Sequence, residues 1–321
     1  MNIEKAVLEI KNPVHKPVMV KEAVEFLRPY PGGIYVDATL GLGGHTEAIL
    51  KYSEYRAKII GFDIDDESLS LSKKRLSGSA GQVVFVNRNY SEIQEVLESM
   101  GVDELDGIVA DLGMSSFHIE ASGRGFSFLK DEPLDMRMDA RLRFTASDLV
   151  NEMDEEEISR ILSTYGEEKW SKRIAREILR FRRGAAIKTS AQLADIVSGA
   201  IPKQFHPQNI HPATKTFQAF RIAVNNELEN LERFLQEAVP LVKVGGRIVI
   251  ISFHSLEDRL VKNTFKKLSS PCICPPGLPR CGCGRKSILK IITRSPVMAG
   301  VEELLDNPRA RSAKLRVGER I

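Results

Sequence analysis

The chain has 321 residues, of which 42% are hydrophobic and 28% are charged. This is ordinary globular composition, sufficient for one large domain or two smaller ones. No apolar run approaches the ~18 residues that a membrane span needs, and the N-terminal segment lacks the apolar region of a signal peptide. We therefore expect a cytoplasmic protein with no membrane partner. The net charge of +3 is too small to indicate nucleic acid by itself.

Short apolar segments alternate with polar, helix-prone segments in the first part of the chain. The predicted strands are residues 34–38, 57–64, 82–87 and 105–113. Strands separated by helical segments indicate βαβ units and a parallel sheet. Parallel strands are buried on both faces, which explains why these segments are continuously apolar.

The alternation stops after the fourth strand, and residues 115–145 show no clean period. Helices are predicted next. Asp154 and Glu157 form a capping-box pattern, Ser190 is expected to cap a later helix, and one long helix is expected over 215–238.

The strand pattern then resumes. The Gly245–Gly246 pair predicts a turn before a strand at 247–253, and residues 288–294 and 313–319 can supply the last strands. The predicted architecture is α/β, with one sheet domain formed by residues 1–117 and 213–321. A mostly helical domain, residues 118–212, interrupts it.

The segment IYVDATLGLGGHTEAIL, residues 34–50, predicts a nucleotide-binding turn between a strand and a helix. A dinucleotide fingerprint requires G-x-G-x-x-G. Gly41 and Gly43 supply two glycines, but position 46 is Thr. Asp37, at the strand end, is awkward beside a pyrophosphate and suits a ligand with an ammonium group. S-adenosylmethionine (SAM) is such a ligand, so SAM is favoured, while NAD remains the alternative.

Polar residues also end the other predicted strands. Asp63 can accept both ribose hydroxyls of a nucleoside, Tyr90 could pack on adenine, and Asp111 ends the fourth strand. Open α/β sheets bind ligands at the carboxyl ends of their strands. Each Asp could instead simply cap the following helix, but the combination favours a SAM site.

Two basic runs are candidates for phosphate binding. Residues 172–183 include Lys172, Arg173, Arg176 and Arg180, and residues 309–320 include Arg309 and Arg311. Such runs are often solvated faces, so charge alone leaves the two interpretations equally open.

All four cysteines lie in CICPPGLPRCGC, at Cys272, Cys274, Cys281 and Cys283. Clustered cysteines in a cytoplasmic protein indicate metal or a structured loop before disulfides. Zinc sites usually contain C-x2-C pairs, and C-x-C fits less well. The sequence therefore favours a proline-stiffened loop without metal and leaves zinc open.

Several longer motifs resemble the RsmH (MraW) family of bacterial SAM-dependent 16S rRNA cytosine-N4 methyltransferases. The resemblance runs from about residue 15 to the C-terminus. Its motifs are HKPVMVKEAVEFL, DATLGLGGHTEAIL, DLGMSS, RGFSF, PLDMRMD, TFQAFRIAVNNEL, ISFHSLEDR, CICPPGLPRCGCG and NPRARSAKLRVGER. It implies a class I methyltransferase (Rossmann-like) sheet with a helical insert, and methylation of the N4 amine of a decoding-centre cytidine (position 1402).

The same resemblance implies a set of SAM contacts: Gly43, Gly44, His45, Asp63, Tyr90, Asp111 and His118. Two of these positions depart from the commonest family pattern, which has Phe at 90 and Gln at 118. Tyr90 retains an aromatic ring, and His118 can still form a hydrogen bond. The implied partner is 16S rRNA in the small ribosomal subunit, and a homodimer is left open.

The acceptor of the N4 proton is not readable from the D/N/S-P-P-Y/F motif of many amino methyltransferases, because DLGMSS stands in its place. The candidates are Asp111, Asn225 and His254. His254 could instead be a packed loop residue bonded to Glu257 or Asp258.

Arg124, Phe126 and Arg137 lie in RGFSF and PLDMRMD and could grip phosphate or stack on a base. A non-catalytic rRNA-binding assembly factor and, less favoured, a DNA amino methyltransferase remain alternative functions.

Overall fold

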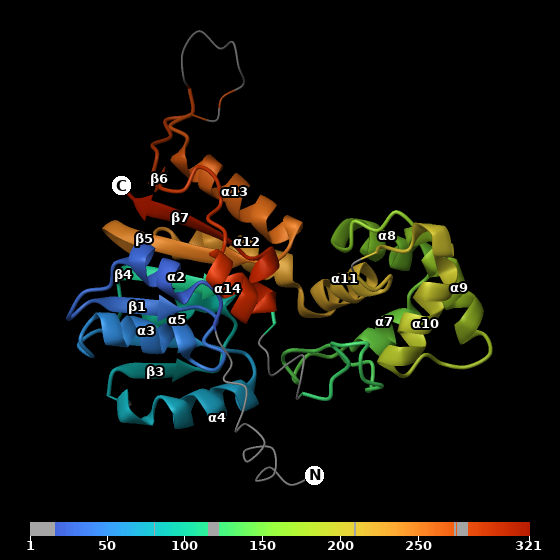
Figure 1. The fold of residues 1–321 in the computed structure, drawn as a ribbon. Coiled ribbons are helices and arrows are strands. Elements are labelled where there is room, and N and C mark those ends of the chain that lie inside the picture. Colours follow the sequence, from blue (N-terminus) through green and yellow to red (C-terminus); the bar gives the residue numbers. More distant parts are fainter. Residues whose placement is uncertain (1–16, 80, 115–121, 209, 273, 275–281) are drawn as a thin grey trace. The chain divides into compact units, whose positions relative to one another are not determined.

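A seven-stranded sheet forms the centre of one of the two units into which the chain divides (Figure 1). The computed structural model describes residues 17–79, 81–114, 122–208, 210–272, 274 and 282–321. The sheet unit comprises Met1–Gly113 and Asn230–Ile321, and the second unit comprises Met114–Glu229. Among the described residues, no helix has the length and apolar character to cross a membrane.

All seven predicted strands form. They are β1 (Ile34–Asp37), β2 (Lys58–Phe62), β3 (Val83–Val86), β4 (Leu105–Asp111), β5 (Val242–Ser252), β6 (Leu289–Ile291) and β7 (Lys314–Arg320). Their order in the sheet is β3-β2-β1-β4-β5-β7-β6. The first five strands are parallel, and β7 runs antiparallel to both β5 and β6.

The point where the strand order reverses lies between β1 and β4. From β1 the chain adds β2 and β3 on one side, whereas β4 and β5 lie on the other. Asp37 and Val109 are register partners in the β1–β4 pair, so the ends of these two strands are adjacent. Ligands of open α/β sheets bind at such a switch point.

Alternating strand residues build one hydrophobic core on each face of the sheet. Ile60 and Ile108 pack on one face, and their neighbours Ile59 and Val109 pack on the other. This period of two follows from strand geometry. The first face is covered by α5 (Ile93–Ser99), α12 (Glu227–Ala238) and α13 (Ser255–Ser269). The second is covered by α2 (Val20–Leu27), α3 (Gly44–Tyr52), α4 (Asp66–Arg75) and α14 (Val301–Asp306).

Helices form most of the second unit. They are α7 (Ala146–Glu152), α8 (Glu155–Tyr165), α9 (Ser171–Arg182), α10 (Ser190–Ala200) and α11 (Thr214–Asn225). The predicted capping box at Asp154 and Glu157 forms at the start of α8. Thr189, rather than Ser190, caps α10 by accepting a hydrogen bond from the Gln192 N–H. Short 3-10 turns complete the chain: η1 (Ser77–Ser79), η2 (Tyr90–Glu92), η3 (Lys203–Phe205) and η4 (Pro308–Ser312).

The single helix predicted over 215–238 is wrong, because the chain breaks at Asn226 into α11 and α12. Asn226 has a φ of 50°, a left-handed conformation that ends α11 and that Asn tolerates better than most residues. Since α11 packs on α7 and α8, the sheet unit resumes at Asn230 instead of at the predicted residue 213.

The strand predicted at 247–253 also begins earlier, at Val242. Register partners advance from Leu105 to Gly107 on β4 but from Val242 to Arg247 on β5. The segment between them bulges, and Gly245, with a φ of 87°, lies within this bulge rather than in a turn before the strand.

Candidate functional site at the β1 and β4 strand ends

The glycine turn after β1 connects the sheet to α3. The Gly43 N–H donates to the Leu40 carbonyl at 2.7 Å. Gly41 and Gly43 have φ angles of 51° and 78°, which residues with a side chain rarely adopt. Gly44 is the first residue of α3, so the turn brings the backbone close to the end of β1, as predicted for a nucleotide-binding turn.

Asp37 lies beneath this turn rather than at its surface. Its side chain is only 1% exposed. One carboxylate oxygen accepts a hydrogen bond from the Thr46 hydroxyl at 2.7 Å, and the other accepts from the Thr39 N–H at 3.3 Å. Burial raises the pKa of Asp37, while His45 and Thr46 oppose this shift. Asp37 therefore ties β1 to α3, and both of its carboxylate oxygens already accept a hydrogen bond. Its predicted contact with an ammonium group stays a prediction.

Thr39 and Thr46 are site residues that no sequence motif marks. Thr46 occupies the position of the third fingerprint glycine and bonds Asp37. The Thr39 hydroxyl accepts a hydrogen bond from the Asp111 N–H at 2.6 Å, so it links the turn to the end of β4. The sequence indicated a special role only for Thr46, because it stands where the dinucleotide fingerprint has its third glycine.

His45 connects the turn to the segment before α2. Its Nε2 lies 3.0 Å from the Val18 carbonyl oxygen, and because a carbonyl only accepts, Nε2 carries a proton. Its Nδ1 faces Asp111 Oδ2 at 3.9 Å. The His45 side chain is 5% exposed and lies between the Val18 carbonyl and Asp111.

Asp111 is the strand-end carboxylate that remains available to a ligand. Its Oδ1 is buried and has no hydrogen-bond partner among the residues that the structure describes, while its side chain is 20% exposed. Burial raises the pKa of Asp111 to about 7; His45 lowers it, and Asp37 raises it further. A buried carboxylate oxygen without a donor is costly, so this atom is suited to accept a hydrogen bond from a cationic ligand.

Asp63 follows β2 and Tyr90 follows β3. The Asp63 carboxylate accepts hydrogen bonds from the Gly41 and Asp65 N–H groups, both at 2.9 Å. These two hydrogen bonds hold the Asp63 carboxylate beside the turn. The ring of Tyr90 is half-buried and packs edge-on against Phe234.

The geometry thus brings together Asp37, Gly41, Gly43, Gly44, His45, Asp63 and Asp111. His118 lies outside the described residues.

Two of the three proposed proton acceptors already have structural partners. The side chain of Asn225 is 6% exposed; its oxygen accepts from the Met138 N–H, and its amide donates to the Met136 and Arg221 carbonyls. His254 caps α13 by accepting from the Glu257 N–H, and its Nε2 lies 3.2 Å from Glu257 Oε1. His254 therefore caps a helix, while its buried Nε2 has no hydrogen-bond partner among the described residues, and Asn225 holds the backbone of its own unit.

The arginines considered for RNA contact in the 122–145 segment also have internal partners. Arg124 donates to the Met138 carbonyl at 3.0 Å. Arg137 pairs with Asp135 at 2.7 Å and donates to the Leu142 carbonyl; the hydrogen bond to Asp135 raises its pKa. Phe126 is buried. These contacts hold the loop in place, and the RNA-contact role of the three residues stays a prediction.

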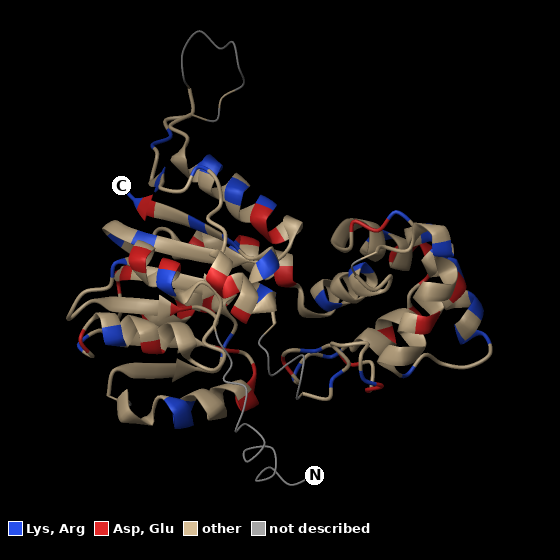
Figure 2. Ribbon diagram, in the orientation of Figure 1, with Lys and Arg blue, Asp and Glu red and all other residues tan. Residues whose placement is uncertain are grey.

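The two basic runs have different structures. On α9, Lys172 and Arg173 are exposed, and Arg176 and Arg180 are 69% and 76% exposed. Figure 2 shows basic residues along this helix. The 309–320 run instead divides between η4 and β7, where Arg316 is buried in an ion pair with Asp258.

The strand order, with an antiparallel β7 between β5 and β6, and the acidic strand ends around a glycine turn define a class I SAM-dependent methyltransferase fold. Residues 12–321 match the family model described as the MraW methylase family. The chain belongs to this family.

Relatives of similar length support this assignment. The chain is 50% identical over 307 residues to a protein of Geobacter sulfurreducens named ribosomal RNA small subunit methyltransferase H, covering 96% of this chain and 99% of that protein. It is 48% identical to a protein of the same name from Clostridioides difficile, with the same coverage. Among solved structures, an rRNA methylase from Streptococcus thermophilus aligns with a TM-score of 0.42 at 10% identity, covering 97% of this chain and 99% of that one.

The close packing of the turn yields a stability prediction. A Cβ atom at Gly44 would lie 2.5 Å from Pro17 Cγ, whereas a Cβ at Gly78 meets nothing within 4 Å. We expect Gly44→Ala to lower the free energy of unfolding by about 1–3 kcal/mol, the usual cost of overpacking. Calorimetry is the suitable measurement, because the single tryptophan, Trp170, reports on the second unit. Gly78→Ala is the control, and equal effects of the two substitutions would contradict the packing argument.

Proposed function

We propose that the chain is a SAM-dependent methyltransferase that methylates the exocyclic N4 amine of a decoding-centre cytidine (position 1402) in 16S rRNA. Membership of a methylase family and the names of the relatives, which are small-subunit rRNA methyltransferases, support the reaction class and the kind of substrate. The N4 atom and the decoding-centre position rest on the motifs that resemble the RsmH (MraW) family.

The observation that carries the cofactor proposal is the carboxylate of Asp111. Its buried Oδ1 has no donor within the described part of the chain, and the α-ammonium group of SAM would supply one. Asp63 would accept ribose hydroxyls, Tyr90 would pack against adenine, and the turn at Gly43 and Gly44 would pass close to the methionine part. These residues therefore fit SAM, which supplies an electrophilic methyl group on a sulfonium.

In this mechanism the protein contributes alignment and the exclusion of water. Asp37 and Thr46 hold the first turn of α3 against β1, and Thr39 holds the end of β4 beside it. Asp111 would hold the cofactor. The proton lost from N4 must pass to a base or to water, and Asp111, Asn225 and His254 stay the candidates for its acceptor. Cytosine N4 is a weak nucleophile because its lone pair is delocalised, and the target base must leave its stack to be reached.

The second unit contributes a basic surface for the RNA. The apolar side chains of Ile174 and Ile178 bury one face of α9, so its basic residues lie on the other. Lys172 and Arg173 have no ion-pair partner among the described residues, while Arg180 pairs with Glu177 at an exposed site. An exposed ion pair stabilises a protein by only ~0–1 kcal/mol, so an RNA phosphate can compete with Glu177 for Arg180.

Methyl transfer from tritiated SAM tests the function directly. Undermethylated small subunits, naked 16S rRNA and DNA are offered separately, and labelled nucleosides are identified and mapped. We expect label in N4-methylcytidine at one cytidine of the rRNA. RNA binding without label would favour a non-catalytic assembly factor, label on DNA would favour a DNA amino methyltransferase, and label on another rRNA base would refute the N4 assignment alone.

Asp111→Asn should weaken cofactor binding. Loss of a hydrogen bond to a charged group costs about 1.5–3 kcal/mol, so we expect Kd to rise by a factor of about 10 to 150. S-adenosylhomocysteine is the probe for calorimetry, since it lacks the sulfonium that acidifies the neighbouring amino group. Asp103→Asn, on the exposed loop before β4, is the control. An unchanged Kd together with a reduced kcat would instead identify Asp111 as the proton acceptor.

The pH dependence of this binding has a definite sign. The pKa of Asp111 is raised to about 7, and an ammonium group binds the ionised carboxylate. Affinity should therefore fall as the pH drops, by roughly tenfold between pH 8 and pH 6. Asp111→Asn should abolish this dependence, and a wild-type Kd that is flat over the range would contradict the assignment.

Removing charge from α9 should weaken RNA binding. For the double variant Lys172→Ala/Arg173→Ala, the slope of log K against log salt should become shallower by ~0.7–0.9 for each lost phosphate contact. Filter binding to 16S rRNA over a salt series measures this. Lys51→Ala/Lys74→Ala, which removes the same charge from exposed positions of the sheet unit, is the control. Equal slopes for wild type and the α9 variant would show that this surface of α9 does not contact RNA phosphates.

A further inference from the structure

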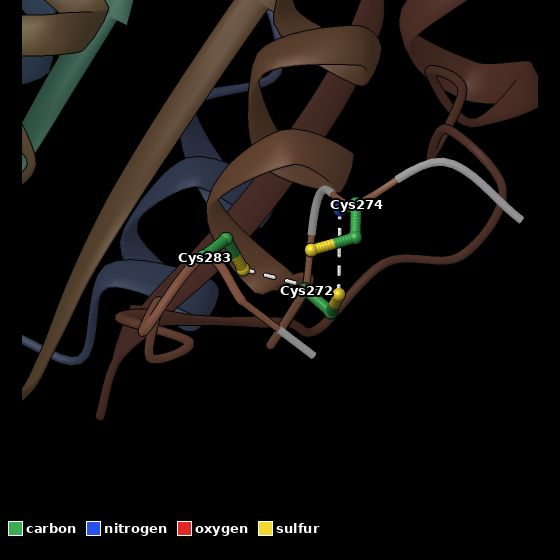
Figure 3. A group of neighbouring side chains, drawn as sticks. All are labelled: Cys272, Cys274 and Cys283. Atoms are coloured by element: carbon green, nitrogen blue, oxygen red, sulfur yellow. Dashed lines mark hydrogen bonds between the residues drawn. The ribbon is translucent and has the colours of Figure 1, made fainter. Parts of the chain in front are cut away.

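Three cysteine sulfurs gather on the loop that joins α13 to β6. The Sγ atoms of Cys272, Cys274 and Cys283 all lie within 4.8 Å of one another, and those of Cys272 and Cys283 are 3.9 Å apart. Figure 3 shows the three side chains converging from the two limbs of the loop. The C-x-C spacing alone favoured a loop without metal. It could not show that Cys283 lies next to Cys272 and Cys274 in the folded chain.

The separation of the sulfurs distinguishes between a disulfide and a metal site. A disulfide requires sulfur atoms ~2.05 Å apart, far closer than the 3.9 Å between Cys272 and Cys283. In a tetrahedral zinc site, a Zn–S distance of ~2.3 Å places neighbouring sulfurs ~3.8 Å apart. The 3.9 Å separation, at which the Cys283 thiol donates to Cys272 Sγ, matches the spacing of two ligands of one ion and not that of a disulfide.

A backbone hydrogen bond also supports a ligand role. The Cys274 N–H donates to Cys272 Sγ at 3.4 Å, as seen from the dashed line in Figure 3. Hydrogen bonds to ligating atoms orient them and tune the metal. This bond orients the sulfur of Cys272 within the group, next to the sulfur of Cys274.

The described part of the loop lies outside the two hydrophobic cores. None of the described residues between 270 and 286 is buried. At its base, the Ser287 hydroxyl donates to the Ser269 carbonyl, and the Ile288 N–H donates to the Leu268 carbonyl, both at 3.0 Å. Beyond these two hydrogen bonds, the side chains that group together in the described part of the loop are the three cysteines. A structural metal ion can supply the stabilisation that such a segment lacks.

We propose that Cys272, Cys274 and Cys283 bind one Zn²⁺ ion, which cross-links the two limbs of the loop. Three thiolates suit zinc, whose structural sites are tetrahedral and sulfur-rich. The fourth position is open to water or to one further donor. Cys281 lies outside the described residues and carries no part of the proposal. The role of the ion within this proposal is structural, because its three ligands come from one loop between α13 and β6.

Metal analysis of untagged protein, purified under reducing conditions, tests the proposal. Mass spectrometry of the metal content should give one zinc per chain. Cys272→Ser, Cys274→Ser and Cys283→Ser should each lose it, whereas Ser270→Ala, two residues before Cys272, should retain it. Circular dichroism and S-adenosylhomocysteine binding report whether each variant is folded. Protein that contains iron, or that contains no metal and cannot be loaded with zinc, would overturn the proposal.

A second measurement needs no variant. Wild-type protein is stripped with a chelator and loaded with Co²⁺, whose near-ultraviolet charge-transfer bands report thiolate ligands. We expect these bands, and we expect hydrogen exchange in residues 270–286 to slow when zinc is returned. Absence of the bands, or a disulfide among these cysteines in the non-reduced mass spectrum of native protein, would refute the site. Because neither measurement requires methyl transfer, failure here leaves the proposed methyltransferase function unaffected.

Discussion

Burial of two carboxylates at neighbouring strand ends is the constraint on which the candidate site depends. Parallel pairing of β1 with β4 puts Asp37 and Asp111 at the same edge of the sheet. Removing a carboxylate from water is costly unless hydrogen-bond donors replace the water. Thr46 and Thr39 supply donors to Asp37. Oδ1 of Asp111 has none among the described residues, so a bound cation would offset the cost of its burial.

The turn between these carboxylates shows how one substitution changes the use of a common motif. A glycine at position 46 would allow close helix packing in a dinucleotide site, but Thr46 instead gives Asp37 a hydroxyl. Asp37 can then remain buried while it secures the start of α3. Thr at position 46 therefore adds a hydrogen bond that holds the turn. It does not merely weaken a dinucleotide site.

Polar residues that stand out in the sequence are often used to build the protein. Asn225 fixes the backbone at Met136 and Met138, His254 caps a helix, and Arg137 joins a loop to Asp135. Residue type and spacing cannot separate these roles from catalysis or RNA binding, because the partners are distant in sequence or set by side-chain orientation. The exposed residues of α9 remain the better candidates for phosphate.

The sequence by itself determined the α/β class, the seven strands and the glycine turn, because apolar runs and turn residues act locally. It also placed Asp63 and Asp111 at strand ends. Tertiary structure decided what depends on contacts distant along the chain: the buried position of Asp37, the break at Asn226, and the return of Cys283 to the first cysteine pair. Periodicity reports which face of an element is apolar, whereas hydrogen-bond partners and burial are fixed only when distant segments pack together.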